Sequence, residues 1–311
     1  MNTIRIKQVD ACTIKPFTGN PAGVVTNANG LSTDHMLKIA NEMNVSETVF
    51  ALKPENEDEH DLRIRWFTPS QEVDLCGHAT LALFHALAEE GEFGLEVDEP
   101  QSFLVETRSG VLNVDVEWQD MQPYIKFNLP IPRFSPFPDD ISMLCGALGL
   151  SEIELSKKVK PQITDNGYCY ILVSDFDSLR TLEPNMLLLK KLKERHDLSG
   201  FAVVTTDNNG KDLVDWHMRF FAPSLGVAED PVTGSANGPM AVFLWENGFL
   251  DKKKKYFTFK ASQGEFVGRP GQINVIMTID KGKVDSIQIA GQCITVLDGT
   301  MTLNPQIPEK L

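Results

Sequence analysis

The chain has 311 residues, enough for two domains, and its composition shows neither a disordered nor a fibrous bias. Its formal net charge of −14 argues against a nucleic-acid-binding protein, which would carry a basic face. No apolar run approaches the roughly 20 residues of a membrane helix, and the five cysteines form no C-x-x-C pair. We therefore expect a reduced, cytoplasmic protein without a membrane or nucleic-acid partner.

The first half of the chain predicts a mixture of strands and helices. In chain order these are a strand within 1–14, a helix at 32–44, strands at 46–52 and 61–67, and a helix at 76–87. The first strand lacks the apolar core of a signal peptide. Ser32 or Thr33 is a suitable N-cap for the first helix. The second helix follows a small-residue turn and is apolar all round, which is typical of a buried helix.

The second half of the chain repeats this order. Residues 215–224 (DWHMRFFAPS) match residues 61–70 (DLRIRWFTPS) without a gap. The identical pairs are Asp61 and Asp215, Arg65 and Arg219, Phe67 and Phe221, Pro69 and Pro223, and Ser70 and Ser224. Further matches are 200–206 with the strand at 46–52, 233–244 with the helix at 76–87, and a helix expected at 185–197 with that at 32–44.

Such a repeat predicts an α+β fold of two pseudo-symmetric lobes. An apolar helix in a strand-rich unit fits inside a curved, barrel-like sheet that wraps round it. The proline-rich stretch at 128–140 suits a linker. We expect a first lobe at 1–127, joined by a C-terminal segment near 297–311, and a second lobe at 128–296. Because ligand sites favour domain interfaces, we expect the site in a cleft between the lobes.

Glu47 differs in kind from its counterpart in the repeat. It alternates with Val45 and Val49 along a strand, so these side chains are expected on one face. The counterpart, Phe201, indicates that this face suits an apolar side chain. A carboxylate there is costly unless it is paired or functional, and desolvation would raise its pKa. Glu47 is thus a candidate general acid/base, the alternative being an edge-strand glutamate that faces solvent.

Cys76 and Thr233 occupy matching positions in the two halves. An epimerase that uses thiols needs one on each face of the reacting carbon, and a threonine hydroxyl is a very poor base at neutral pH. The mismatch therefore argues against a two-thiol epimerase. A single carboxylate that removes a proton and returns it elsewhere on the same face would instead give an isomerase.

Gly77 and Gly234 open the two predicted buried helices. Helix N-termini present free N–H groups and a positive dipole end, so they bind anions. We expect the backbone at Gly77–His78 and Gly234–Ser235 to hold a substrate carboxylate. Asp230 lies just before the second turn, where it is expected to pair with His78, orient the imidazole and raise its pKa.

A serine hydrolase is a competing interpretation of the same residues. Ser235, His78 and Asp230 have the residue types of a catalytic triad. The G-x-S-x-G elbow is missing, however, because Thr233 and Asn237 stand where glycine is needed. The motif therefore gives this interpretation little weight.

Metal and cofactor sites have weaker support still. Cys76, His78 and His85 offer metal ligands, but neither H-E-x-x-H nor paired C-x-x-C occurs, and a histidine in an apolar helix is more often part of the core. No G-x-G-x-x-G or Walker A loop is present. We therefore expect neither a metal nor a nucleotide cofactor.

Several stretches together resemble the phenazine-biosynthesis PhzF-like family, within the diaminopimelate-epimerase fold. They are PFTGNPAGVV at 16–25, SETVF at 46–50, RWFTPSQEVDLCGHATLA at 65–82, RFFAPSLGVAEDPVTGSA at 219–236 and QGEFVGRPG at 263–271. The resemblance covers nearly the whole chain. It implies two similar lobes, each a curved sheet round a central helix, with the active site between them. It also implies a homodimer and no cofactor.

The resemblance also implies roles for individual residues. The glutamate of the SET motif, here Glu47, would be the acid/base, and His78 and Asp230 would line the site. The residues that it places at the substrate carboxylate are Ser46, Gly77, Gly234 and Ser235. Cys76, which lacks a partner thiol, would pack beside the site. The best-known member of the family isomerises a dihydro-hydroxyanthranilate by moving a proton along a conjugated system.

The leading hypothesis is therefore a cofactor-independent isomerase of a small carboxylate, with Glu47 moving the proton. One alternative is a non-catalytic protein that keeps the cleft to bind a metabolite. The other, with less support, is a hydrolase based on Ser235.

Overall fold

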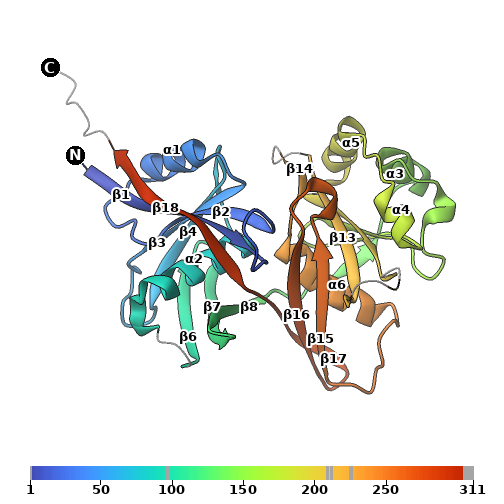
Figure 1. Cartoon of the computed structure of the whole chain (residues 1–311). Coiled ribbons are helices and arrows are strands. Elements are labelled where there is room, and N and C mark those ends of the chain that lie inside the picture. The colour runs from blue at the N-terminus through green and yellow to red at the C-terminus, as the bar shows by residue number, and fades with distance from the viewer. Residues whose placement is uncertain (1, 96–98, 208–209, 211–212, 224–226, 304–311) are drawn as a thin grey trace. The chain divides into compact units, whose positions relative to one another are not determined.

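A computed structural model describes residues 2–95, 99–207, 210, 213–223 and 227–303 (Figure 1). Ser224 of the predicted repeat, and residues 304–311 of the predicted C-terminal segment, lie outside this part. The chain divides into two compact units. Unit 1 comprises two segments of the chain, one that ends at Phe127 and one that begins at Gly291. Unit 2 comprises Asn128–Ala290.

Unit 1 is built round one mixed sheet. Its strands are β1 (Asn2–Ala11), β2 (Asn20–Val25), β3 (Glu47–Leu52), β4 (Leu62–Phe67), β5 (Glu72–Val73), β6 (Gln101–Thr107), β7 (Gly110–Gln119), β8 (Gln122–Leu129) and β18 (Cys293–Leu303). They pair in the order β18-β1-β2-β3-β4-β6-β7-β8, with β5 on β4. The sequence predicts that the chain returns to unit 1 near residue 297. It returns earlier, at Gly291, because β18 begins at Cys293 and pairs with β1.

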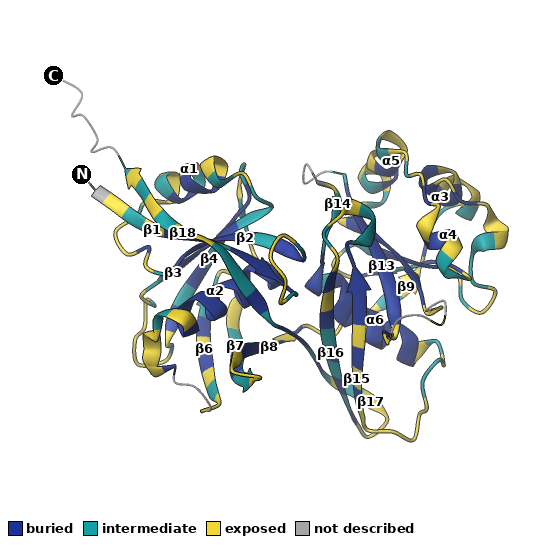
Figure 2. Cartoon of the chain, viewed as in Figure 1, coloured by how far each residue is buried: buried dark blue, intermediate teal, exposed yellow. Residues whose placement is uncertain are grey.

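The helices of unit 1 are α1 (Thr33–Met43), α2 (Gly77–Glu90) and the short 3-10 helix η1 (Glu92–Gly94). The N-cap prediction for α1 is confirmed, because the Ser32 side chain accepts a hydrogen bond from the His35 N–H. α2 contacts β1, β2, β3 and β18, and its residues Gly77 to Ala88 are all buried (Figure 2). A sheet can cover a helix on so many sides only by curving round it.

Unit 2 has a sheet of the same kind. Its strands are β9 (Phe134–Pro136), β10 (Gln162–Thr164), β11 (Tyr168–Leu172), β12 (Gly200–Thr205), β13 (Trp216–Ala222), β14 (Val227–Asp230), β15 (Tyr256–Gln263), β16 (Gly271–Asp280) and β17 (Lys283–Gly291). The order is β9-β10-β11-β12-β13-β15-β16-β17, with β14 on β13. Pairs β11/β12 and β13/β15 are parallel, as are β2/β3 and β4/β6 in unit 1.

The buried helix of unit 2 is α6 (Gly234–Glu246). It is closely packed: a Cβ added at Gly234 would come within 2.4 Å of Ile289 Cδ1 on β17, and one at Gly238 within 2.4 Å of Leu129 Cδ1. Glycine fits at these two positions because buried side chains pack directly against the helix backbone. The other helices are α3 (Ile141–Leu148), α4 (Phe176–Arg180), α5 (Met186–His196), and the 3-10 helices η2 (Glu152–Glu154) and η3 (Glu265–Val267). No helix in the described part is long and apolar enough to cross a membrane.

Candidate active site

Three segments of unit 1 meet around the imidazole of His78. Asn20 is the first residue of β2, Ser46 immediately precedes β3, and Glu47 begins β3. Because β2 and β3 run parallel and pair Ala22 with Glu47, their amino ends lie side by side. His78 is the second residue of α2, which packs against both strands.

The two ring nitrogens of His78 have different neighbours. Nε2 lies 3.4 Å from Glu47 Oε2 and 3.2 Å from Ser46 Oγ. Nδ1 lies 3.3 Å from Asn20 Nδ2 and 3.5 Å from Cys76 Sγ. The structure thus brings Ser46, Glu47 and His78 together, with Cys76 packed against the same ring.

The Glu47 side chain points into the unit. Only 17% of it is exposed, and Val49, on the same face of β3, is fully buried. β3 pairs with β2 on one side and β4 on the other, so it is an interior strand. The alternative of an edge-strand glutamate that faces solvent is therefore wrong.

The imidazole of His78 is neutral at pH 7. Burial lowers its pKa to about 4, and a hydrogen bond to the backbone carbonyl of Pro21 offsets only part of that effect. The expected rise in the pKa of His78 is therefore wrong in direction, because desolvation of the ring dominates. The contact with Glu47 is consequently not an ion pair, because the ring carries no charge. Asp230 belongs to unit 2, so its pairing with His78 stays a prediction.

Glu47, Cys76 and His78 also present three potential metal ligands within 4.8 Å of one another. A carboxylate, a thiol and an imidazole suit zinc. A histidine that binds metal through Nε2 normally donates its Nδ1–H to an acceptor, but here Nδ1 faces the NH₂ group of Asn20, which is itself a donor. The surroundings of the ring therefore fit proton chemistry better than a metal ion. His85 is not part of this cluster.

In unit 2, the side chain of Gln263 forms hydrogen bonds with the turn that leads into α6. Its Oε1 accepts hydrogen bonds from the Thr233 N–H (3.1 Å) and Asn237 Nδ2 (2.9 Å). Its Nε2 donates to Thr233 Oγ1 (3.0 Å) and to the backbone carbonyl of Asp230 (2.8 Å). Thr233 Oγ1 in turn donates to the Asp230 carboxylate at 2.5 Å. The position of Asp230 relative to the start of α6 is thereby fixed.

Neither buried helix is capped by a side chain at its start. Cys76 is the N-cap of α2 and Thr233 the N-cap of α6, and neither side chain makes a capping hydrogen bond. The N–H groups of each first turn, at Gly77 and Gly234, are thus not used by a cap. A helix N-terminus of this kind suits an anion such as a carboxylate.

Ser235, the second residue of α6, has a tyrosine as a neighbour. Its Oγ lies 3.0 Å from Tyr168 OH. The histidines of unit 2, His196 and His217, each contact a carboxylate instead. Within unit 2 the structure therefore gives Ser235 no histidine that would act as the base of a hydrolase.

Sequence reasoning missed Asn20 and Gln263. Both lie in stretches that carry the family resemblance, at 16–25 and 263–271. Each stands at the end of a strand, where alternation predicts which face a side chain takes but not which residue far along the chain it contacts. Asn20 is fully buried and Gln263 almost so. A buried amide needs hydrogen-bond partners, and this need is the signal that would have singled them out.

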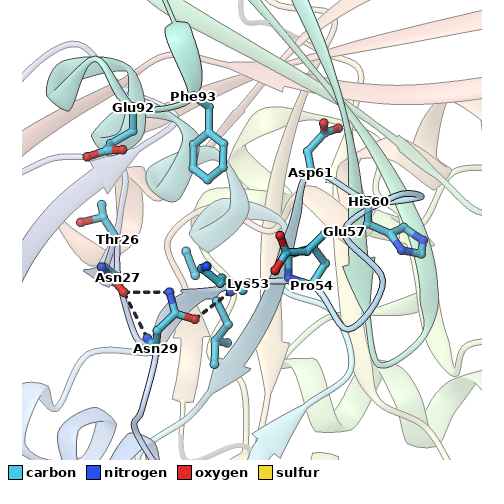
Figure 3. Close-up of a pocket in the computed structure, with 12 residues that line it drawn as sticks. Thr26, Asn27, Asn29, Lys53, Pro54, Glu57, His60, Asp61, Glu92 and Phe93 are labelled. Atoms are coloured by element: carbon cyan, nitrogen blue, oxygen red, sulfur yellow. Dashed lines mark hydrogen bonds between the residues drawn. The ribbon is translucent and has the colours of Figure 1, made fainter.

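Unit 1 has a further pocket, away from His78. A cavity of about 450 Å³ is lined by Lys53, His60 and Phe93, among others (Figure 3). Asn29 and Asn27 are hydrogen-bonded to each other there, and Asn29 Oδ1 accepts from the Lys53 N–H. The pocket lies at the carboxyl ends of β2 and β3, whereas Glu47 stands at their amino ends.

Comparison with known proteins places the chain in a family. It matches the model of the family described as phenazine biosynthesis-like protein over residues 9–299. It is 36% identical over 301 residues to an uncharacterized isomerase of Clostridium acetobutylicum (96% of this chain, 97% of the relative). It is 32% identical over 301 residues to the trans-2,3-dihydro-3-hydroxyanthranilate isomerase of Pseudomonas chlororaphis (95% and 98%).

A solved structure confirms the expected fold. The crystal structure of a phenazine biosynthesis protein of the PhzF family from Bacillus anthracis has a TM-score of 0.86 to this chain at 30% identity. The match covers 97% of this chain and 100% of the other. Together with the buried helix and curved sheet of each unit, these matches show that the chain belongs to the phenazine biosynthesis-like (PhzF) family and is an isomerase.

Proposed function

We propose that the chain is a cofactor-independent isomerase of a small carboxylate, in which Glu47 moves a proton. The observation that carries the proposal is the mostly buried Glu47 carboxylate, held 3.4 Å from the neutral ring of His78. A carboxylate in such surroundings is suited to general acid/base work. Membership of an isomerase family supports the same reaction class.

In the proposed reaction, Glu47 takes a proton from a carbon alpha or vinylogous to an activating group. The electrons of the broken C–H bond shift the double bond, and Glu47 returns the proton to another carbon on the same face. His78 assists by hydrogen bonding, and Asp230 from unit 2 stabilises developing charge. No electron is gained or lost overall, so the step needs no redox partner.

The substrate carboxylate is proposed to bind at the two helix N-termini. The uncapped first turns of α2 and α6 supply backbone N–H groups at Gly77 and Gly234. Ser235 adds a hydroxyl that is half-buried beside Tyr168. Ser46, 3.2 Å from His78 Nε2, is proposed to complete the binding surface in unit 1.

A panel of small carboxylates in D₂O tests the reaction class. Its first member is trans-2,3-dihydro-3-hydroxyanthranilate, the compound named for the Pseudomonas chlororaphis relative; cyclic and amino-substituted carboxylates follow. Binding is read by thermal shift, and isomerisation with solvent deuterium uptake by mass spectrometry. An isomerised product that carries solvent deuterium supports the proposal. Binding without exchange for every compound would favour a metabolite-binding protein instead.

Two further expectations belong to this proposal. The family resemblance favours a homodimer, which light scattering of the purified chain measures directly. A hydrolase based on Ser235 would be labelled by a fluorophosphonate probe, and we expect no labelling, since the described neighbour of Ser235 is Tyr168.

A further inference from the structure

Four side chains contact the His78 ring, and the amide donor and the carboxylate face opposite ring nitrogens. On the Nδ1 side stand the NH₂ group of Asn20 at 3.3 Å and the thiol of Cys76 at 3.5 Å. On the Nε2 side stand the Glu47 carboxylate at 3.4 Å and the Ser46 hydroxyl at 3.2 Å. An amide NH₂ can only donate, and a carboxylate can only accept.

A neutral imidazole carries one N–H and one lone pair, so its neighbours decide which nitrogen holds the proton. If Nδ1 were protonated, its N–H would point at the N–H of Asn20. With the proton on Nε2, the Asn20 NH₂ donates to the Nδ1 lone pair, and the Nε2–H is directed to Glu47 and Ser46. Each of these four side-chain contacts then joins a donor to an acceptor.

The amide oxygen of Asn20, on the other side of the same group, faces Ser46. Asn20 Oδ1 lies 3.4 Å from Ser46 Oγ, which also lies 3.3 Å from the backbone carbonyl of Pro21. The Ser46 hydroxyl thus has the Asn20 amide oxygen and the Pro21 carbonyl as acceptors, while the NH₂ group of Asn20 faces the His78 ring. Asn20 is fully buried, so water does not compete for its amide group.

We propose that Asn20 is a positioning residue that fixes His78 as the Nε2–H tautomer and so aims a hydrogen-bond donor at Glu47. His78 is then a donor and not a base toward the reacting carboxylate. The effect on catalysis rests on the proposed function. The tautomer itself does not, and it can be measured without any substrate.

The decisive substitution is Asn20→Asp, which keeps the shape of the side chain and replaces the NH₂ donor with an acceptor. A carboxylate at this position favours a proton on Nδ1 and raises the pKa of His78. The matched control is Asn41→Asp, which adds the same charge at an exposed site on α1, where Asn41 donates to the Pro69 carbonyl. Both variants are compared with the wild-type chain by their ¹⁵N–¹H spectra, which also report folding.

Long-range ¹⁵N–¹H correlation of the histidine rings near pH 7 reads the protonated nitrogen directly. We expect an unprotonated Nδ1 and a protonated Nε2 for His78 in the wild-type chain and in Asn41→Asp. In Asn20→Asp we expect the proton on Nδ1 or on both nitrogens. A wild-type Nδ1 that carries the proton would overturn the proposal, even if Asn20→Asp failed to fold. An unchanged tautomer in a folded Asn20→Asp would overturn the role of Asn20.

Steady-state kinetics provide a second test of the role of Asn20, with any carboxylate that the panel identifies as a substrate. We expect Asn20→Asp to lower kcat by about 10- to 100-fold, the factor that corresponds to a hydrogen bond with a charged group, with a smaller change in KM. The acidic limb of its pH–rate profile should move to higher pH with the pKa of His78. An unchanged kcat and pH profile would contradict the positioning role while leaving the acid/base role of Glu47 intact.

Discussion

Burial of His78 makes the stability of the protein sensitive to mild acid. Its pKa is about 4 in the folded chain, against an ordinary value of 6.5. As the pH falls below 6.5, the unfolded chain binds a proton at this residue before the folded chain does, so unfolding becomes more favourable. The contribution of His78 to stability is therefore complete above pH 6.5 and is lost as the pH falls toward 4.

The size of this effect follows from the two values. The interval between 6.5 and about 4 corresponds to about 3 kcal/mol of stability in total. Of this, about 2 kcal/mol should be lost between about pH 7 and about pH 5, because the folded chain still excludes the proton there.

The assay compares the free energy of unfolding in urea of the wild-type chain and of His78→Asn across this pH range. The asparagine variant lacks the titrating ring, so its stability deficit relative to wild type should shrink by about 2 kcal/mol from about pH 7 to about pH 5. His35→Asn, at the partly exposed start of α1, serves as the control. If the deficit of His78→Asn stays constant over the range, the pKa of His78 is not lowered in the folded chain.

Other substitutions test the packing that supports the site. Gly234→Ala should cost about 1–3 kcal/mol, because its Cβ would meet Ile289 Cδ1 at 2.4 Å; thermal denaturation measures the loss. Gln263→Leu should cost at least about 1–3 kcal/mol, because it leaves buried donors at the turn before α6 without an acceptor; urea unfolding measures it. Lys7→Met should cost about 1–3 kcal/mol, because the buried Lys7 ammonium pairs with the mostly buried Glu90 at 3.2 Å; the same unfolding assay applies.

Each of these variants has a matched control. Gly146→Ala, in α3, meets nothing within 4 Å and should stabilise by about 0.5–1 kcal/mol. Gln272→Leu and Lys38→Met alter exposed side chains and should change stability by about 0.5 kcal/mol or less. If the controls lost as much stability as the buried variants, burial of these side chains would not account for the losses.

Local patterns in the sequence predict the elements of this fold well. The Ser32 cap of α1, the buried helix after Cys76 and the inward direction of Glu47 all follow from caps, periodicity and alternation. The return of β18 to pair with β1 is not local: it joins residues from opposite ends of the chain, and no short-range pattern encodes it.

The polar surroundings of the site were harder to predict for the same reason. Asn20 meets Ser46 and His78 only because β2 and β3 pair in parallel and α2 packs against both. The pKa of His78 depends on how fully these elements cover its ring, so a prediction based on one expected charge partner gave the wrong direction.

The most direct test of the account is the rate of solvent deuterium uptake by Glu47→Gln. The reaction is run in D₂O on a carboxylate that the wild-type chain isomerises, beside Glu117→Gln as a glutamate control on β7. If Glu47 carries the proton, Glu47→Gln should lose about 10²–10⁴-fold in both isomerisation and deuterium uptake, whereas Glu117→Gln keeps the wild-type rate. A near wild-type rate in a folded Glu47→Gln would contradict the central claim.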